Sequence, residues 1–494
     1  LLAADQMATI RHQIKSDFLT LRRLFQDTTG KLITTEPTFL SAQFGLQGRI
    51  DVLVEFEKEA QKNRKDIIEL KSSAKYPDAN SSAAWKNDLV QVACYNLLID
   101  STFQDRNGIS AILYSKDKLA PLRDCGKLDF HKHNAMLMRN KIVMLDYQMA
   151  FASERIFDNL YDRLVKANVP SFMLEDGKEF NYKWKTAGKI TRAYFAEFVG
   201  LIIREKLAAK VGGISEREPL NGFSALWKEN AEQKRENFAL LNALEVAFFD
   251  KTNTTIILKR PQHQEQTSAF RQGDIVVLYP CQKPQELEAL RFQLLKGSIS
   301  KLNSEEVHIK LWTSYVDEMF FERYDFWAIE PNLLESSFNH LIASLASFLN
   351  VKQAKKELLL GMKEPKFDPN FYTDYRPQGL SEEQNRILNQ ALSAKDYFLL
   401  QGPPGTGKTS MMLRSMVDFM YKNTKQTIVL LAFTNRATDE ICQKVEQVCG
   451  ADFIRLGNPQ ENNPYRKNSL GQIKNTQELR KKLQNTRVFV STVS

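Results

Sequence analysis

A phosphate-binding pattern late in the chain constrains the fold more than any other feature. Residues 402–409 read G-x-x-x-x-G-K-T and lie between an apolar run, YFLLQ, and a helical run, SMMLRSMVDFMYKN. Glycines let such a loop curl so that backbone N–H groups face phosphate oxygens, and the following helix adds its positive end. The pattern therefore predicts a strand–loop–helix unit that binds ATP.

Within this loop, Lys408 is expected to reach the β- and γ-phosphates and the Thr409 hydroxyl to hold Mg²⁺. Upstream, Gln384 has two compatible interpretations: a capping-box partner of Ser381, or a glutamine that contacts adenine, as in the Q motif of helicases. The predicted nucleotide-binding residues are Gln384, Gly402, Pro403, Pro404, Gly405, Thr406, Gly407, Lys408 and Thr409.

An acidic pattern near the start of the chain predicts a second site. Asp51 lies in GRIDVLV, and Glu69 and Lys71 lie in IIELKSS. Residues i and i+2 of a strand share a face, and pairing of the two strands would bring Asp51 beside Glu69. Two carboxylates so placed can hold one or two Mg²⁺ or Mn²⁺ ions, and the lysine can orient a water or stabilise developing charge. This is the D…E-x-K pattern of PD-(D/E)XK nucleases; the alternative is a solvated strand face.

A helix that follows the acidic pattern carries Gln91 and Tyr95, which share one face at i, i+4 spacing. Gln-x-x-x-Tyr after E-x-K resembles the RecB-like branch of these nucleases, and the resemblance implies that both side chains lie by the DNA backbone. The alternative for Tyr95 is an aromatic side chain that faces the core.

Changes of pattern divide the 494 residues into several parts. Short β-branched runs favour a barrel, and long amphipathic runs such as ITRAYFAEFVGLIIREKLAAK favour helices. QKRENFALLNALEVAFFD is also expected to be helical. We therefore expect an α/β multidomain protein, with a PD-(D/E)XK nuclease-like α/β core over 1–150, a helical stalk over 151–250, a small β-barrel over 251–330, a helix and linker over 331–378, and the N-terminal part of a RecA-like P-loop domain over 379–494.

Composition narrows the class of protein. The formal net charge of +9 mildly favours a polyanionic partner, and the sequence lacks a run of 18 apolar residues, so no membrane partner is expected. Five cysteines without a C-x-x-C pair are typical of a reduced, intracellular protein. We expect a nuclear protein or a cytoplasmic, nucleoid-associated one, and not a secreted one.

Two segments after the P-loop resemble superfamily 1B helicases: LLAFTNRATDEI is similar to their motif Ia and VFVSTVS to the strand with the motif Ic threonine. The resemblance implies a RecA-like fold, 5′-to-3′ translocation and contacts of Thr434, Asn435 and Thr492 with the nucleic-acid backbone. Helix capping is the alternative for Thr434 and Asn435.

The order of the parts resembles the Okazaki-flap nuclease–helicase family over nearly the whole chain. Eukaryotic members carry a four-cysteine iron–sulfur cluster, but the missing C-x-x-C leads us to expect no cluster here. The family's upstream catalytic histidine has no convincing equivalent, since His12 fits a surface helix better. The acidic motif that positions Mg²⁺ and water in these helicases and their second RecA-like lobe do not occur up to Ser494, and the sequence does not start with Met. We therefore expect a fragment that is truncated within the motor and has little ATPase activity.

The sequence therefore predicts an ATP-dependent DNA helicase with metal-dependent single-strand nuclease activity in replication or repair. Single-stranded DNA is the expected partner, with RNA also possible. One alternative is an RNA or DNA helicase or RNP remodeler whose inactive nuclease-like domain only binds. Another is an ATP-gated scaffold of the AAA+ kind, against which the TNRATDEI segment argues.

Overall fold

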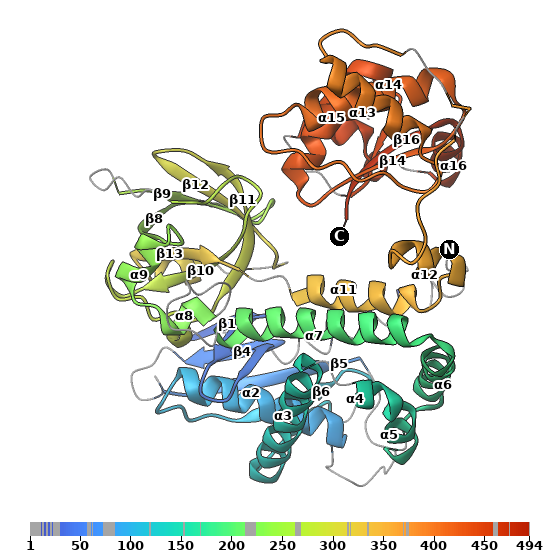
Figure 1. Ribbon diagram of the computed structural model, residues 1–494. Helices are drawn as coiled ribbons and strands as arrows, with labels where there is room; N and C mark the ends of the chain where they lie inside the picture. Colours follow the sequence, from blue (N-terminus) through green and yellow to red (C-terminus); the bar gives the residue numbers. More distant parts are fainter. Residues whose placement is uncertain are drawn as a thin grey trace. The chain divides into compact units, whose positions relative to one another are not determined.

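The computed structural model describes residues 11, 14, 15, 18, 19, 22, 30–56, 61, 63–72, 84–117, 120–151, 154–167, 169–212, 224–261, 268–313, 316, 318–332, 335–368, 370, 371, 375–457, 463–473 and 475–493. The chain forms two units, Leu1–Ile156 with Ala196–Phe338 and Phe157–Phe195 with Asn339–Ser494 (Figure 1). The sequence pattern of residues 1–30 also favours a helix, but most of these residues, His12 among them, lie outside the described part of the chain.

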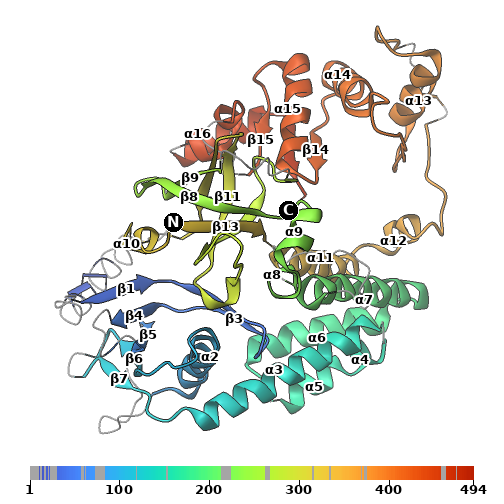
Figure 2. The same ribbon diagram turned by 90° about the vertical axis from the view of Figure 1, so that its left-hand side faces the viewer.

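The first unit opens with a five-stranded sheet in the order β1-β4-β5-β6-β7. Strands β5 and β6 run parallel, and helix α2 (Lys86–Thr102) connects them and covers one face of the sheet (Figure 2). Parallel neighbours need such a crossover. The two paired strands and the following helix expected from the acidic pattern are confirmed. The strands are β1 (Lys31–Thr35), β4 (Val52–Phe56), β5 (Lys65–Lys71), β6 (Ser110–Tyr114) and β7 (Leu122–Asp124).

The face of the sheet under α2 is apolar at one end. Leu53 of β4 pairs with Ile67 of β5, and both pack against Leu98 of α2. Because side chains alternate along a strand, Glu69 and Lys71 lie on the same face as Ile67. The row of side chains beneath α2 therefore changes from apolar to ionisable within two residues of β5.

Strands β1 and β4 belong to a longer antiparallel ribbon that bends halfway. The ribbon continues as β2 (Thr38–Ser41) and β3 (Leu46–Arg49), and the cross-strand register is the same in both halves. At the bend, Glu36 has a φ of 54°, and its amide donates to the carbonyl of Asp51 over 2.9 Å. A positive φ is costly for a residue other than glycine, so the surrounding structure must hold it. The bend thus fixes the backbone at Asp51.

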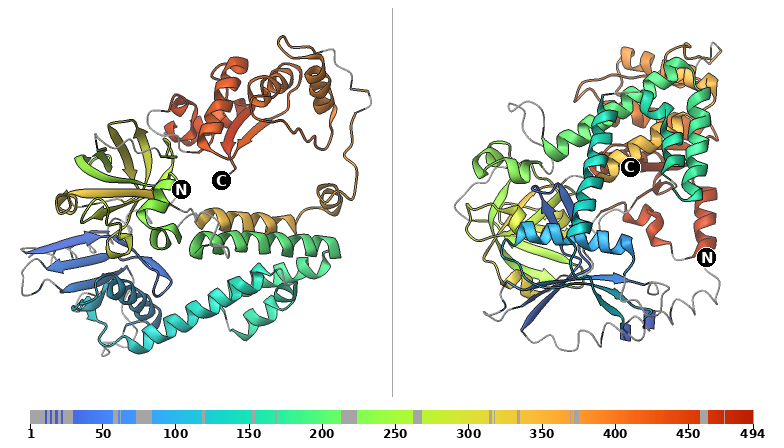
Figure 3. Two further views of the ribbon diagram at one scale, coloured as in Figure 1. Left: turned by 60° about the vertical axis from the view of Figure 1, so that its left-hand side comes forward. Right: turned by 90° about the horizontal axis from the view of Figure 1, so that it is seen from below.

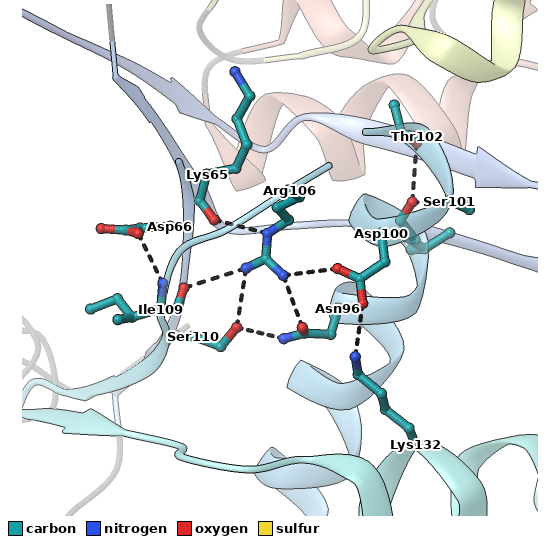
Figure 4. A network of polar contacts seen from close by, with 11 residues as sticks. Lys65, Asp66, Asn96, Asp100, Ser101, Thr102, Arg106, Ile109, Ser110 and Lys132 are labelled. Carbon is teal, nitrogen blue, oxygen red and sulfur yellow. Dashed lines mark hydrogen bonds and ion pairs between the residues drawn. The ribbon is translucent and has the colours of Figure 1, made fainter. Parts of the chain in front are cut away.

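Arg106 ties the far end of α2 to the sheet. Its guanidinium donates to Asn96 and Asp100 of α2 over 2.9 and 3.0 Å, and to the carbonyl of Lys65 on β5 over 2.9 Å (Figure 4). Asn96 is also hydrogen-bonded to Ser110, the first residue of β6. The Arg106 side chain is 5% exposed, so these bonds compensate for the burial of its charge. They fix α2 against both strands that it connects.

Two long helices separate the first sheet from the barrel along the chain. Helix α7 (Lys189–Val211) falls in the region expected to be a stalk, 151–250, whereas α3 (Asp129–Ala150) precedes that region. In the first unit, Arg204 of α7 donates to the carbonyl of Ala150, and Lys206 Nζ lies 2.9 Å from Asp146 Oδ2 of α3. These contacts join the last turn of α3 to the second half of α7.

A closed barrel follows in the first unit, with the strand order β10-β11-β12-β9-β8-β13 (Figure 3). Its core includes the fully buried Leu278, Ile309 and Trp327. The small β-barrel expected from the sequence is confirmed. Its strands are β8 (Leu241–Asp250), β9 (Thr255–Lys259), β10 (Ile275–Cys281), β11 (Leu295–Leu302), β12 (Glu306–Leu311) and β13 (Phe326–Pro331). Shorter elements around it are α8 (Ala225–Lys228), α9 (Ala231–Glu236), η3 (Ala289–Arg291) and α10 (Glu318–Glu322).

The helical interpretation of LLNALEVAFFD is wrong, because these residues include strand β8, which pairs with β9 and β13. Two irregularities make this strand hard to recognise from the sequence. Ala243 has a φ of 56°, and the register with β9 shifts between Val246 and Phe248. Bulges of this kind break the strict alternation by which a strand is recognised, and barrel pairing outweighs the helix propensity of Leu, Ala and Glu.

A buried ion pair lies beside the barrel wall. Lys234 Nζ of α9 is 2.9 Å from Glu330 Oε1 of β13, and the two side chains are 1% and 2% exposed. Tyr279 of β10 donates its hydroxyl to the same carboxylate. Burial raises the pKa of Glu330 and outweighs the opposing effect of Lys234. Each charge therefore depends on its partner.

The second unit contains an aromatic cluster of helices. Trp184 of α6 (Ser171–Thr186) is fully buried, stacks on Phe180 and packs against Phe157 and Phe195. Its indole N–H donates to Asp158 over 2.7 Å. The other helices of this region are α4 (Glu154–Asp158) and α5 (Leu160–Lys166), and further along the chain come α11 (Glu335–Phe348) and α12 (Gln353–Leu359).

The rest of the second unit is built on a parallel three-stranded sheet in the order β14-β16-β15. Val417, Val445 and Val490 belong to its core. None of the helices in the described part of the chain has the length and apolar character needed to cross a membrane. The elements are α13 (Glu382–Ser393), η4 (Lys408–Leu413), α14 (Arg414–Asn423), β14 (Ile428–Ala432), α15 (Asn435–Cys449), β15 (Ile454–Arg455), η5 (Arg466–Asn468), η6 (Leu470–Gln472), α16 (Thr476–Asn485) and β16 (Val488–Thr492).

Replacing Lys234 with Met should destabilise the barrel by about 3 kcal/mol at neutral pH, because Glu330 would be left buried and uncompensated. The loss should shrink at acid pH, where Glu330 is protonated. Urea denaturation of wild type and K234M at both pH values measures the difference. Lys283→Met is the control, since Lys283 pairs with Glu286 on the surface and should leave the midpoint unchanged. Equal midpoints for K234M and wild type would contradict the expectation.

Candidate nuclease centre and nucleotide site

The structure places Asp51 and Glu69 side by side. The β4–β5 register pairs Val52 with Ile68, so Asp51 is opposite Glu69 one step further along. The backbone N–H of Leu70 donates to Asp51 Oδ2 over 2.8 Å. Asp51 is therefore held by the bend behind it and by β5 in front of it, with its carboxylate toward that of Glu69.

A chain of hydrogen bonds continues from Glu69 across to α2. Lys71 Nζ donates to Glu69 Oε1 and to Gln91 Oε1, both over 2.8 Å. Gln91 Nε2 donates to the hydroxyl of Tyr95 over 2.9 Å. All five residues predicted for the nuclease site thus lie in one cluster, three from the ribbon and sheet and two from α2.

Burial dominates the electrostatics of the cluster. Glu69 is 2% exposed, and burial, together with the charge of Asp51, raises its pKa to about 7 against the opposing effect of Lys71. Burial alone would lower the pKa of Lys71, but the carboxylate of Glu69 outweighs it, and the pKa of Lys71 is raised. Lys71 therefore stays protonated, while Glu69 is poised to release its proton near neutrality.

The donor set of the cluster fits a hard divalent cation. Glu69 Oε2 is buried and has no hydrogen-bond partner among the described residues, and the carboxylate of Asp51 lies beside it. Oxygen ligands of this kind suit Mg²⁺ or Mn²⁺, which keep several water ligands. No group of three or more His, Cys, Asp or Glu side chains in the described part of the chain is arranged as a metal cage. A bound ion would therefore depend on water and substrate for its remaining ligands.

Sequence reasoning missed three contributors to this cluster. Asp88 Oδ1 lies 3.8 Å from Lys71 Nζ, and Tyr114 of β6 donates its hydroxyl to Asp88 Oδ2 over 2.8 Å. Asp88, Gln91 and Tyr95 are spaced i, i+3 and i+7, and this spacing indicates that they share one face of the helix. Gly48 of β3 gave no signal: a Cβ there would stand 2.7 Å from the Leu98 side chain and 3.3 Å from the Tyr95 ring.

The P-loop in the second unit curls through two glycines. Gly405 and Gly407 both have a φ of 81°, a conformation that glycine adopts without strain. The helix begins at once with Lys408 and Thr409, so its positive end faces the loop. Lys408 Nζ donates to the carbonyls of Gly402 and Pro403, the latter over 2.7 Å. The ammonium thus lies over the loop that is expected to hold phosphates.

The strand expected before the P-loop is wrong for this structure. Residues 397–401 are not assigned to a strand, and Leu399 is 83% exposed. A strand exists only when its backbone pairs with a neighbour, and the described residues offer none to this segment. Apolar β-prone composition alone therefore misled the prediction.

The capping interpretation of Gln384 is confirmed, and its contact with adenine stays a prediction. Ser381 and Gln384 form a reciprocal capping box at the start of α13. Gln384 Nε2 also lies 3.4 Å from the carbonyl oxygen of Thr406 in the P-loop. The capped helix therefore presents the glutamine next to the nucleotide loop.

The predicted nucleic-acid contacts meet at one edge of the parallel sheet. Ala432 at the end of β14 is paired with Thr492 of β16, and Thr434 and Asn435 follow β14 after one intervening residue. Thr434 Oγ1 accepts from the Ala437 amide over 3.2 Å, so it does cap α15. Both Thr434 and Asn435 remain exposed.

Arg455, which sequence reasoning passed over, orients this edge. Its side chain is 1% exposed and donates to Asp439 over 2.7 Å and to Asn435 Oδ1 over 3.0 Å. A lone arginine in an apolar strand such as FIRLG was the available signal, because a buried guanidinium requires partners. Asn435 is thereby held in a fixed orientation.

Parts of the chain are similar to known proteins. Residues 379–492 match the family model of an AAA domain. The chain is similar to the DNA replication ATP-dependent helicase/nuclease JHS1 of Arabidopsis thaliana, with 24% identity over 45% of this chain and 17% of that protein. It is 32% identical to the DNA replication ATP-dependent helicase/nuclease dna2 of Schizosaccharomyces pombe, over 22% of this chain and 8% of the relative.

A third relative has a different description. The DNA-binding protein SMUBP-2 of Mesocricetus auratus is 22% identical over 39% of this chain and 19% of its own length. The aligned parts thus span less than a fifth of each of these three relatives. Together the similarities support a superfamily 1 helicase domain of the type found in the replication helicase/nucleases.

Replacing Glu69 with Gln should stabilise the metal-free protein at alkaline pH. Between about pH 4.5 and 7 the folded protein keeps the Glu69 proton that the unfolded chain has released, so the free energy of unfolding of the wild type falls as pH rises through this window. E69Q lacks this slope, and its advantage should reach about 3 kcal/mol above pH 7. Urea denaturation in EDTA from pH 4 to 8 measures it.

Glu306→Gln is the matched control, because His308 lowers the pKa of that exposed carboxyl and the substitution should give no gain at alkaline pH. A constant difference between wild type and E69Q across the whole pH range would show that Glu69 is not a buried, titrating carboxyl.

Proposed function

We propose that the protein is an ATP-dependent DNA helicase that also cleaves single-stranded DNA with the help of a divalent metal ion, in DNA replication or repair. The observation that carries the proposal is the contact chain Glu69–Lys71–Gln91–Tyr95 beside Asp51, in one polypeptide with a P-loop. Similarity to two helicase/nucleases supports the same combination. A nuclear or nucleoid location follows from such a role.

In the nuclease centre, Asp51 and Glu69 would hold Mg²⁺ or Mn²⁺. A bound ion of this kind makes a coordinated water more acidic and offsets phosphate charge. Lys71 is fixed between Glu69 and Gln91, so its ammonium can orient the attacking water or stabilise charge that develops on the phosphate. Tyr95 is held by Gln91 and would position the strand.

In the motor, Gly402–Thr409 would bind ATP with Mg²⁺, and Gln384 would contact adenine. Lys408 would exchange the carbonyls of Gly402 and Pro403 for the β- and γ-phosphates. The exposed edge formed by Thr434, Asn435 and Thr492 would contact the nucleic-acid backbone, with 5′-to-3′ movement.

The similarity to SMUBP-2 favours a second candidate, a DNA or RNA helicase or RNP remodeler whose first sheet domain binds nucleic acid without cutting it. The AAA-domain match taken alone also fits an ATP-gated scaffold. Cleavage of single strands separates the first candidate from both of these.

Substitutions in the two units test the nuclease half and the ATP-binding half of the proposal separately. E69Q should abolish Mg²⁺-dependent cleavage of a labelled single-stranded oligonucleotide, and Lys71→Met should slow it about a hundredfold or more, while both bind a fluorescent ATP analogue normally. Lys408→Ala should weaken nucleotide binding at least about tenfold, because a charge-assisted contact is lost, and should leave metal-dependent cleavage in place.

Lys422→Ala is the control for K408A, since Lys422 is exposed on α14 and pairs with Asp418. Single-stranded RNA is assayed in parallel with DNA. Equal cleavage by wild type and E69Q would remove Glu69 from the reaction, and superimposable nucleotide titrations of wild type and K408A would refute the P-loop assignment.

A further inference from the structure

A cavity of about 490 Å³ lies between the barrel and the half of the bent ribbon that is formed by β2 and β3, within the first unit. The backbone N–H of Leu294 donates to the carbonyl of Thr38 over 2.8 Å and joins its two walls. Neither the proposed nuclease chemistry nor the P-loop uses this cavity. It is lined by Glu36, Thr38, Gln47, Gly48, Arg49, Lys210, Gln293, Leu294, Leu295, Lys296, Trp312 and Thr313.

The lining combines one large aromatic ring with an excess of cations. Trp312 is 47% exposed although it is among the largest apolar side chains. The amide of Trp312 donates to the carbonyl of Lys296 over 2.9 Å, in continuation of the β11–β12 register. Directly opposed residues of an antiparallel pair point to the same face, so the Lys296 and Trp312 side chains leave the barrel on the same face. Arg49 and Lys210 add two further positive charges, against the single carboxylate of Glu36.

The cavity is close to the candidate nuclease centre. Arg49 precedes Asp51 by two residues, which is about 7 Å along an extended chain. Arg49 also pairs with Glu36 at the bend, 3.4 Å from guanidinium nitrogen to carboxylate oxygen. Gly48, on the cavity wall, lies against the Tyr95 ring. The cavity and the candidate nuclease centre are therefore neighbours along the ribbon.

We propose that this cavity is a binding subsite for single-stranded nucleic acid, in which a base stacks on Trp312 and the adjoining phosphates contact Lys296, Arg49 and Lys210. An exposed aromatic ring among cations recognises a base and a phosphate together, the combination that single strands offer and duplexes hide. The subsite rests on the proposed function, since it positions the strand that the nuclease centre would cut.

The test measures binding of a fluorescein-labelled oligothymidylate to the E69Q protein, which keeps the strand intact, and cleavage by the otherwise wild-type protein. W312A should weaken binding about tenfold, and W312F should restore most of it. Lys296→Gln should reduce the slope of log affinity against log salt by about 0.7, the value for one phosphate contact on a single strand. In cleavage, W312A should raise KM and leave kcat nearly unchanged.

Two matched controls lie on the same barrel. Phe248 of β8 is 60% exposed and does not line the cavity, so F248A should bind like wild type. Lys301 lies on β11 as Lys296 does, but at the other end of the strand, and K301Q should keep the full salt slope. Photocrosslinking of a 5-iodouracil oligonucleotide, followed by peptide mass spectrometry, should label Trp312.

The outcomes distinguish the subsite from the proposed function. Loss of affinity in W312A and K296Q without cleavage by the wild type would support the subsite and refute the nuclease. Normal cleavage with W312A and K296Q equal to wild type in affinity, salt slope and KM would overturn the subsite and leave the nuclease standing. An equal loss of affinity in F248A and W312A would also overturn the subsite.

Discussion

The arrangement of the candidate site in the first unit depends on the position of the Glu69 carboxylate beneath helix α2. Glu69 continues the row that Leu53 and Ile67 begin, so α2 covers it as it covers the core. Burial of the charge is costly, and Lys71 and Gln91 offset part of that cost through hydrogen bonds. Arg106 at the other end of α2 keeps the helix close enough for these bonds to form. The chemistry of the site follows from this conflict between burial and charge.

Much of this arrangement could be predicted from the sequence, because local patterns determine it. The E-x-K spacing placed Glu69 and Lys71 on one face, and the i, i+4 spacing aligned Gln91 with Tyr95. The strand register then brought Asp51 into place. The bend at Glu36 and the close approach of Gly48 to Tyr95 could not be predicted, since both arise from packing between segments distant from each other in the chain.

The failures have the same origin. Strand β8 was not predicted because a residue at positive φ and a shifted register disrupt its alternation of buried and exposed side chains. A strand was wrongly predicted over residues 397–401 because a strand requires a paired neighbour and not only an apolar composition. Arg455 was overlooked because its role appears only when β15 lies beside α15. By contrast, the P-loop was predictable, since its glycines are required by the loop backbone itself.

The barrel and the five-stranded sheet of the first unit differ in whether they have unpaired edge strands. Every strand of the closed barrel has a neighbour on each side, whereas the five-stranded sheet ends in β1 and β7. An open strand margin can recruit another chain and seed aggregation. Strand β7 has only three residues, and its Arg123 is bound to Asp117 over 2.7 Å. Such a short border discourages the addition of a strand from another chain on this side of the sheet.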